Sequence, residues 1–180
     1  MNPTEWQETI VARLMRGGPT CQHAARVILD RKPRIGFARQ SRSGARWTLK
    51  GDIQMAPDAY SCGVVSARLL GAIVHETTHL EQGLLLRLSV EGEVQGWTAE
   101  FKAREELEGA GLGPGITDRH WQNIASLPAS PTDRQLRYAR SEMLACAPRY
   151  LIWLLPLRPG RWPLVPFIPL GPLLAYYGMP

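Results

Sequence analysis

One short segment of the 180-residue chain carries side chains that can do metal chemistry together, His75-Glu76-Thr77-Thr78-His79. Residues four apart on a helix lie on the same face, so the imidazoles of His75 and His79 are expected to converge on one metal ion. Glu76 stands beside the first ligand and can take a proton from a water that zinc has acidified to a pKa of about 7. Imidazole and carboxylate ligands suit zinc, so the segment predicts a Zn²⁺ site with Glu76 as the general base.

This segment resembles the active-site motif of the zincin metallopeptidases, and more narrowly that of the gluzincins. Residues 34–101 carry the resemblance. His75 and His79 match the family's zinc ligands, and Glu76 matches its general base. The resemblance implies a sheet edge before the active-site helix and a glutamate ligand on the next helix. It also implies a zinc-dependent hydrolase, a small metallopeptidase acting on a peptide or protein substrate.

Residues just beyond the motif narrow the resemblance. The metzincin pattern needs Gly at position 82 and His at position 85, where this chain has Gln82 and Leu85, so that variant is excluded. Zincins often have an apolar residue a little beyond the motif, at the position where this chain departs from them with Glu81.

The third metal ligand is expected from the segment that begins at about Ser89. Glu93 falls between two stripes that both favour burial, so Glu93 is the preferred ligand. Glu91 lies nearer the solvent side but precedes Gly92, as the ligand does in some gluzincins, and it stays an alternative, with Glu100 and His120 behind it. The apolar stripe is Val90, Val94, Trp97 and Phe101, and the small-residue stripe is Gly92, Gly96, Ala99 and Ala103. Glycines four apart inside a helix favour close packing against another helix.

A hydrolase also needs a group that stabilises the oxyanion beside the metal. The candidates are Tyr60, His120, Arg137 and Tyr138. The sequence does not choose among them.

The elements that position the motif follow from hydrophobic periodicity and from capping and turn residues. A first helix runs from Asn2-Pro3-Thr4 to Gly17-Gly18-Pro19, and a second, capped by Thr20, ends near Lys32-Pro33. The pattern then predicts strands over 34–40 and 45–55, a turn over 41–44, and helices over 61–82, 89–108, 117–127 and 132–147. The order predicts an α+β fold, mainly helical, with a small β-hairpin or sheet before the active-site helix.

The chain is expected to divide into a zincin-like metal-binding domain, 1–147, and a proline-rich tail, 148–180. The tail has eight prolines among apolar residues, so it is too interrupted to form a membrane helix. It is expected to be irregular and to pack on its own domain, with a partner or self-association surface and contact with a membrane interface as the alternatives.

The charge is unevenly distributed along the chain, whose net charge is +5. Residues 51–110, which contain the motif, hold four Lys and Arg against ten Asp and Glu. No nucleic-acid motif accompanies the basic residues of the first fifty positions, so these residues are expected to form an ordinary solvated surface. A basic adaptor with an incidental metal, and a catalytically inactive zincin-like binding protein, remain alternatives to the hydrolase.

The cysteines and the N-terminal residues indicate the cellular compartment in which the protein is expected. The three cysteines, Cys21, Cys62 and Cys146, are far apart and do not suggest a disulfide framework. No basic stretch followed by an apolar one occurs at the start, so no signal peptide is expected. These observations favour a cytoplasmic protein.

Overall fold

The computed structural model describes residues 2–39, 43–60, 64–148 and 151–159. These residues form a mixed α+β fold, as predicted, in which helices predominate. The strands are β1 (Ile35–Phe37), β2 (Ala45–Trp47) and β3 (Ile53–Met55). The helices are α1 (Pro3–Met15), α2 (Pro19–Arg31), α3 (Ala67–Glu81), α4 (Leu84–Arg87), α5 (Val90–Gly109), α6 (Arg119–Ala125) and α7 (Asp133–Cys146), followed by the 3-10 turn η1 (Leu151–Leu154).

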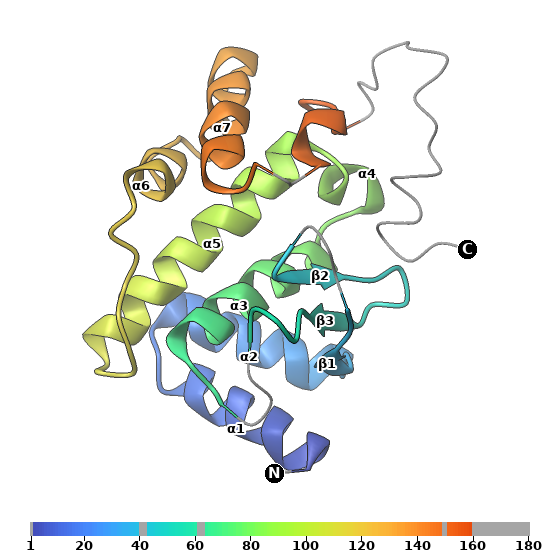
Figure 1. The fold of residues 1–180 in the computed structure, drawn as a ribbon, viewed down its shortest axis with the longest axis vertical. Helices are drawn as coiled ribbons and strands as arrows, with labels where there is room; N and C mark the ends of the chain where they lie inside the picture. Colours follow the sequence, from blue (N-terminus) through green and yellow to red (C-terminus); the bar gives the residue numbers. More distant parts are fainter. Residues whose placement is uncertain (1, 40–42, 61–63, 149–150, 160–180) are drawn as a thin grey trace.

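Two central helices, α3 and α5, pack against each other along much of their length (Figure 1). Helices α1 and α2 flank this pair on one side, and α6 and α7 pack on α5 on the other. Twelve of the fifteen residues of α3 are buried, which explains why its sequence is almost continuously apolar around the motif. The motif therefore lies in the middle of the protein, between α5 and the sheet.

Helix α3 begins later than the sequence pattern predicted. The helix was expected to start near residue 61, but the described residues 64–66 are not helical and the first helical residue is Ala67. Ser66 is the N-cap, and its hydroxyl accepts a hydrogen bond from the backbone N–H of Leu69 at 3.1 Å. A serine in this position satisfies one of the free N–H groups of the first turn, and this defines the start of the helix.

The predicted two-stranded hairpin is replaced by a three-stranded sheet. The second expected strand, 45–55, is interrupted by a turn in which Gly51 has φ of +82° and the Thr48 hydroxyl accepts from the backbone N–H of Asp52 at 3.1 Å. The turn folds β2 back onto β3 as an antiparallel pair, and β1 pairs with β3 in parallel. The strand order is β1-β3-β2, so β2 lies at an edge, next to α3. Of the predicted turn over 41–44, residues 41 and 42 lie outside the described residues.

The N-terminus of α2 is capped from a distant helix. Gly18, and not Thr20, is the N-cap, and it offers no side-chain hydrogen bond. The carboxylate of Glu106 in α5 accepts instead from the backbone N–H groups of Thr20 and Cys21, both at 2.9 Å. A negative charge there also favours the positive end of the helix dipole, so this contact joins α2 to α5.

The first described residues of the proline-rich segment pack on the helical body. Ile152 and Leu155 are buried in the same core as the helices. The carbonyl of Pro156 accepts from the backbone N–H of Val90 at 2.8 Å, at the start of α5. The remainder of the predicted tail, 160–180, lies outside the described residues. Within the part of the chain that the structure describes, no helix has both the length and the apolar character needed to cross a membrane.

Candidate metal centre

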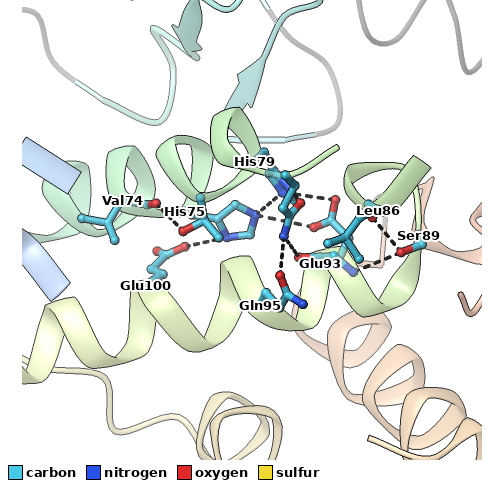
Figure 2. A network of polar contacts seen from close by, with 11 residues as sticks. Val74, His75, His79, Leu86, Ser89, Glu93, Gln95 and Glu100 are labelled. Carbon is cyan, nitrogen blue, oxygen red and sulfur yellow. Dashed lines mark hydrogen bonds and ion pairs between the residues drawn. The ribbon is translucent and has the colours of Figure 1, made fainter. Parts of the chain in front are cut away.

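Three buried side chains meet where α3 faces the first turn of α5 (Figure 2). The Nε2 atoms of His75 and His79 lie 3.1 Å apart. The two carboxylate oxygens of Glu93 reach them, with Oε2 3.5 Å from His75 Nε2 and Oε1 3.5 Å from His79 Nε2. The residues are 7%, 1% and 1% exposed, respectively. The structure thus brings together the two histidines and the glutamate that the sequence preferred as a ligand set.

The outward nitrogen of His79 is already engaged. Its Nδ1 lies 2.9 Å from Oε1 of Gln82. The orientation of that amide is determined on its other side, because its Nε2 donates to the carbonyl of Gly92 at 3.1 Å and to Oε1 of Gln95 at 2.9 Å. The atom facing His79 is therefore an acceptor, so His79 Nδ1 carries the hydrogen and its Nε2 presents a lone pair to the cluster.

The outward nitrogen of His75 is engaged in the same way. Its Nδ1 lies 3.3 Å from Oε2 of Glu100, two turns along α5 from Glu93 (Figure 2). A carboxylate on the far nitrogen of a ligating histidine orients the ring and makes the inner nitrogen a better donor to a metal. Gln82 and Glu100 therefore hold both rings with Nε2 turned inward.

The inner side of the cluster requires a positive charge. Two imidazole lone pairs and an ionised carboxylate repel one another unless a proton or a metal cation lies between them. Oε2 of Glu93 is buried and makes no hydrogen bond within the described residues. Burial would raise the Glu93 pKa, but the nearby His79 and His75 outweigh it and hold the pKa well below its usual range. Two nitrogens and a carboxylate oxygen match a zinc site with its fourth position open, so the residues fit the metal.

The protonation of His75 responds to the same surroundings. Burial acts to lower the His75 pKa, but the neighbouring carboxylates of Glu100, Glu93 and Glu76 outweigh it and raise the pKa well above its usual value. A proton and a metal ion would thus compete for the same inward-facing nitrogens, because a ligating histidine must be neutral.

Glu76 lies beside this cluster and points to the sheet side. Its side chain is 6% exposed, and burial raises its pKa although the charges of His75 and His79 act against the rise. A hydrogen bond with the backbone of Trp47 in β2 also lowers the pKa and holds the carboxylate. The edge strand therefore positions the predicted base, and the raised pKa moves it towards the neutral range that general bases need.

A cavity of about 500 Å³ opens beside Glu76 and His75. Tyr60, alone among the four candidate oxyanion groups, lines it. His120 is elsewhere, with Nδ1 3.3 Å from Glu142. Arg137 and Tyr138 are exposed on α7 and do not line the cavity. Burial and the charge of Glu100 raise the pKa of Tyr60 to about 12, so its phenol keeps its proton at neutral pH.

The alternatives to Glu93 have other partners. Glu91 forms an ion pair with Arg158, 3.2 Å from Nη1, on the side of α5 away from the histidines. Glu100 contacts His75 through the outer nitrogen and not the inner one. Sequence reasoning did not assign these orienting roles to Gln82 and Glu100. The spacing of Gln82, three residues after His79 and so on the same helical face, was the available signal.

Comparison with known proteins adds no identification: no protein-family model matches the chain, and no match was found among curated proteins or solved structures. The interpretation of the cluster therefore depends on its own chemistry.

Proposed function

We propose that the protein is a zinc-dependent hydrolase, a small metallopeptidase that cleaves peptide bonds, with His75, His79 and Glu93 as the zinc ligands. The observation that carries the proposal is the convergence of two Nε2 atoms 3.1 Å apart on one buried carboxylate, while both Nδ1 atoms are occupied by Glu100 and Gln82. Such an arrangement is unfavourable unless a proton or a metal cation lies among these atoms. Beside it lie a buried carboxylate with a raised pKa and an open cavity, which a purely structural metal site does not need.

The chain's own residues supply the proton transfers. Bound zinc would provide a Lewis acid that polarises the carbonyl and lowers the pKa of water. Glu76 accepts one proton from the attacking water as its oxygen bonds to the carbonyl carbon. When the C–N bond breaks, Glu76 gives that proton to the leaving amine, so one water is consumed and a carboxylic acid and an amine are formed. The raised pKa of Glu76 suits both transfers.

Tyr60 is the group we assign to the developing oxyanion. It lines the cavity together with His75 and Glu76. Because its pKa is raised to about 12, its O–H remains available as a hydrogen-bond donor throughout the neutral range.

The test is a matched pair of substitutions on α3. Glu76→Gln removes the base, and Glu81→Gln changes the exposed glutamate that contacts His23 at 2.7 Å. We expect one zinc per chain in the wild type and both variants. We expect hydrolysis of a quenched fluorescent peptide library to fall by about 10²-fold or more in Glu76→Gln and to be unchanged in Glu81→Gln.

Two results would contradict the proposal. Absence of stoichiometric zinc in protein purified without chelators would remove the metal. Zinc without turnover on any peptide in the wild type would favour a catalytically inactive metal-binding protein instead.

A further inference from the structure

The cavity beside the candidate metal centre has a cationic end that the hydrolysis itself does not use. Arg68 of α3 and Arg104 of α5 line it together with Tyr60, at a distance from His75 along the helices. Arg68 precedes His75 by seven residues, so their Cα atoms are separated by about 10 Å along the helix axis. His75 and Glu76 thus line the same cavity as the two guanidinium groups, and Arg68 lies two helical turns before His75.

Backbone carbonyls hold Arg104 in place, and the charges of Glu100 and Glu108 act on it as well. Its Nε donates to the carbonyl of Pro114 and its Nη2 to that of Gly115, both at 3.1 Å. Its side chain crosses α3 directly over Gly71, where a Cβ would lie only 2.9 Å from Arg104 Cδ. The guanidinium is therefore positioned beside the cavity, one helical turn before His75, with donor capacity left on Nη1.

Arg68 is the more accessible of the two. Its guanidinium carbon lies 5.5 Å from the centre of the Tyr60 ring, and its side chain is exposed. Across residues 2–39, 43–60, 64–148 and 151–159, neither Arg68 nor Arg104 forms an ion pair with a carboxylate. Two adjacent guanidinium groups repel each other, so an anion between them is favoured.

The three carboxylates of described residues that line the cavity have other contacts or roles. Glu100 contacts His75, and Glu76 is the proposed base. Asp118 caps α6 by accepting from the backbone N–H groups of His120 and Trp121, at 2.8 and 3.3 Å. None of these three carboxylates forms an ion pair with Arg68 or Arg104, so both guanidinium groups can donate to the carboxylate of a ligand.

An aromatic wall stands on the α5–α6 side of the cavity. The rings of Trp97 and Trp121 have centroids 4.1 Å apart with 34° between their planes, and both line the cavity. Such a surface takes an apolar or aromatic side chain. The volume of about 500 Å³ is in the range for a small ligand such as a dipeptide.

We propose that this cavity binds the free terminal carboxylate of a peptide, through Arg68 and Arg104, with an apolar or aromatic last side chain against Trp97 and Trp121. Each extended residue spans about 3.5 Å, so the carboxylate lies within about three residues of the scissile bond. The substrate class is then short peptides or peptide ends that carry a free carboxy terminus. This inference rests on the proposed hydrolase, but its binding part is testable apart from it.

The experiment compares one ligand in two charge states. N-acetyl-phenylalanine and its amide differ only in the terminal carboxylate. Their binding is measured by calorimetry to wild type, Arg68→Gln and Arg134→Gln, the last an exposed arginine of α7 outside the cavity. Each protein is tested with zinc and after chelation, because a bound metal can itself attract a carboxylate. The same pair of termini is then compared in kcat/KM on cleavable dipeptides.

We expect the acid to bind about tenfold to a hundredfold more tightly than the amide in wild type and Arg134→Gln, with or without metal. We expect Arg68→Gln to abolish this preference. Equal binding of acid and amide, no binding of either, or a preference that survives Arg68→Gln or requires zinc would overturn the inference. Carboxylate preference without hydrolysis would refute only the hydrolase, and hydrolysis without that preference would refute only this inference.

Discussion

Gly96 is the position where one added methyl group tests the metal centre most directly. A Cβ on Gly96 would lie 2.8 Å from Nε2 of His75, the atom proposed to bind zinc, and 3.0 Å from Cδ2 of the same ring. The ring has little freedom to retreat, because it is 7% exposed and its Nδ1 contacts Glu100. Gly96→Ala therefore displaces the metal-facing side of the His75 ring, while all three proposed ligand residues remain unchanged.

The size of the effect follows from these distances. Nonbonded heavy atoms are most favourable at about 3.5 Å or more, so the His75 ring must shift by roughly 0.7 Å. Metal–ligand distances tolerate only about 0.2 Å. We expect Gly96→Ala to weaken zinc binding at least as much as loss of an orienting group does, about tenfold to a hundredfold. The metal-free protein should change less, because alanine gains about 1 kcal/mol of helix propensity that offsets part of the clash.

The assay is competition with a chromophoric zinc chelator, together with thermal unfolding of the metal-free proteins. Gly109→Ala is the matched control, since it lies at the end of the same helix and a Cβ there meets no atom within 4 Å. It should leave zinc affinity unchanged. If Gly96→Ala binds zinc as tightly as the wild type, the inward-facing nitrogens are not the ligands and the proposed centre is wrong.

Two further predictions concern the scaffold around the site. Burial would raise the Glu106 pKa, but hydrogen bonds from Cys21 and Thr20 outweigh it and hold the pKa below its usual value. Its ionised form therefore stabilises the fold above the unfolded-state pKa, about 4.3, and this stability is lost as pH falls through the lower folded value. Glu106→Gln should lower the free energy of unfolding by about 1 kcal/mol at pH 7, and the loss of this free energy in acid should be smaller than in the wild type. Both are measured by urea titration from pH 7 to pH 3. Equal acid sensitivity of the two proteins would contradict the prediction. Ile152 is fully buried, so Ile152→Ala should lower the free energy of unfolding by about 2–5 kcal/mol. Trp153 is 59% exposed, so Trp153→Ala should change it by about 0.5 kcal/mol or less. Equal effects would show that residues 151–159 are not part of the core.

The helices were predictable because their signals are local. Pro3 and Asn2 begin α1, Ser89 begins α5 and Thr132 begins α7, each through a cap that the sequence displays. The choice of Glu93 over Glu91 also followed from helical periodicity, since α5 buries the side that contains Glu93. Whether these residues bind metal stays a prediction.

The strands were less predictable, because their pairing depends on distant residues. The sequence over 45–55 alternates like one strand, yet Gly51 and Thr48 form a turn within it. The parallel pairing of β1 with β3 has no local signal, since each backbone hydrogen bond joins residues well separated along the chain. Likewise, the cap of α2 by Glu106 joins residues more than eighty positions apart, which no capping rule within the helix can indicate.

Spacing along one helix was enough to place His75, Glu76 and His79 together, because the geometry of an α-helix puts residues four apart on one face wherever it occurs. Packing alone decided the rest. Only the contact between α3 and α5 brings Glu93 and Glu100 to opposite nitrogens of His75, and only the edge of the sheet places a backbone group beside Glu76. The cavity with its two arginines exists because α3, α5 and α6 meet there, a relation between surfaces that no periodicity along the chain can express.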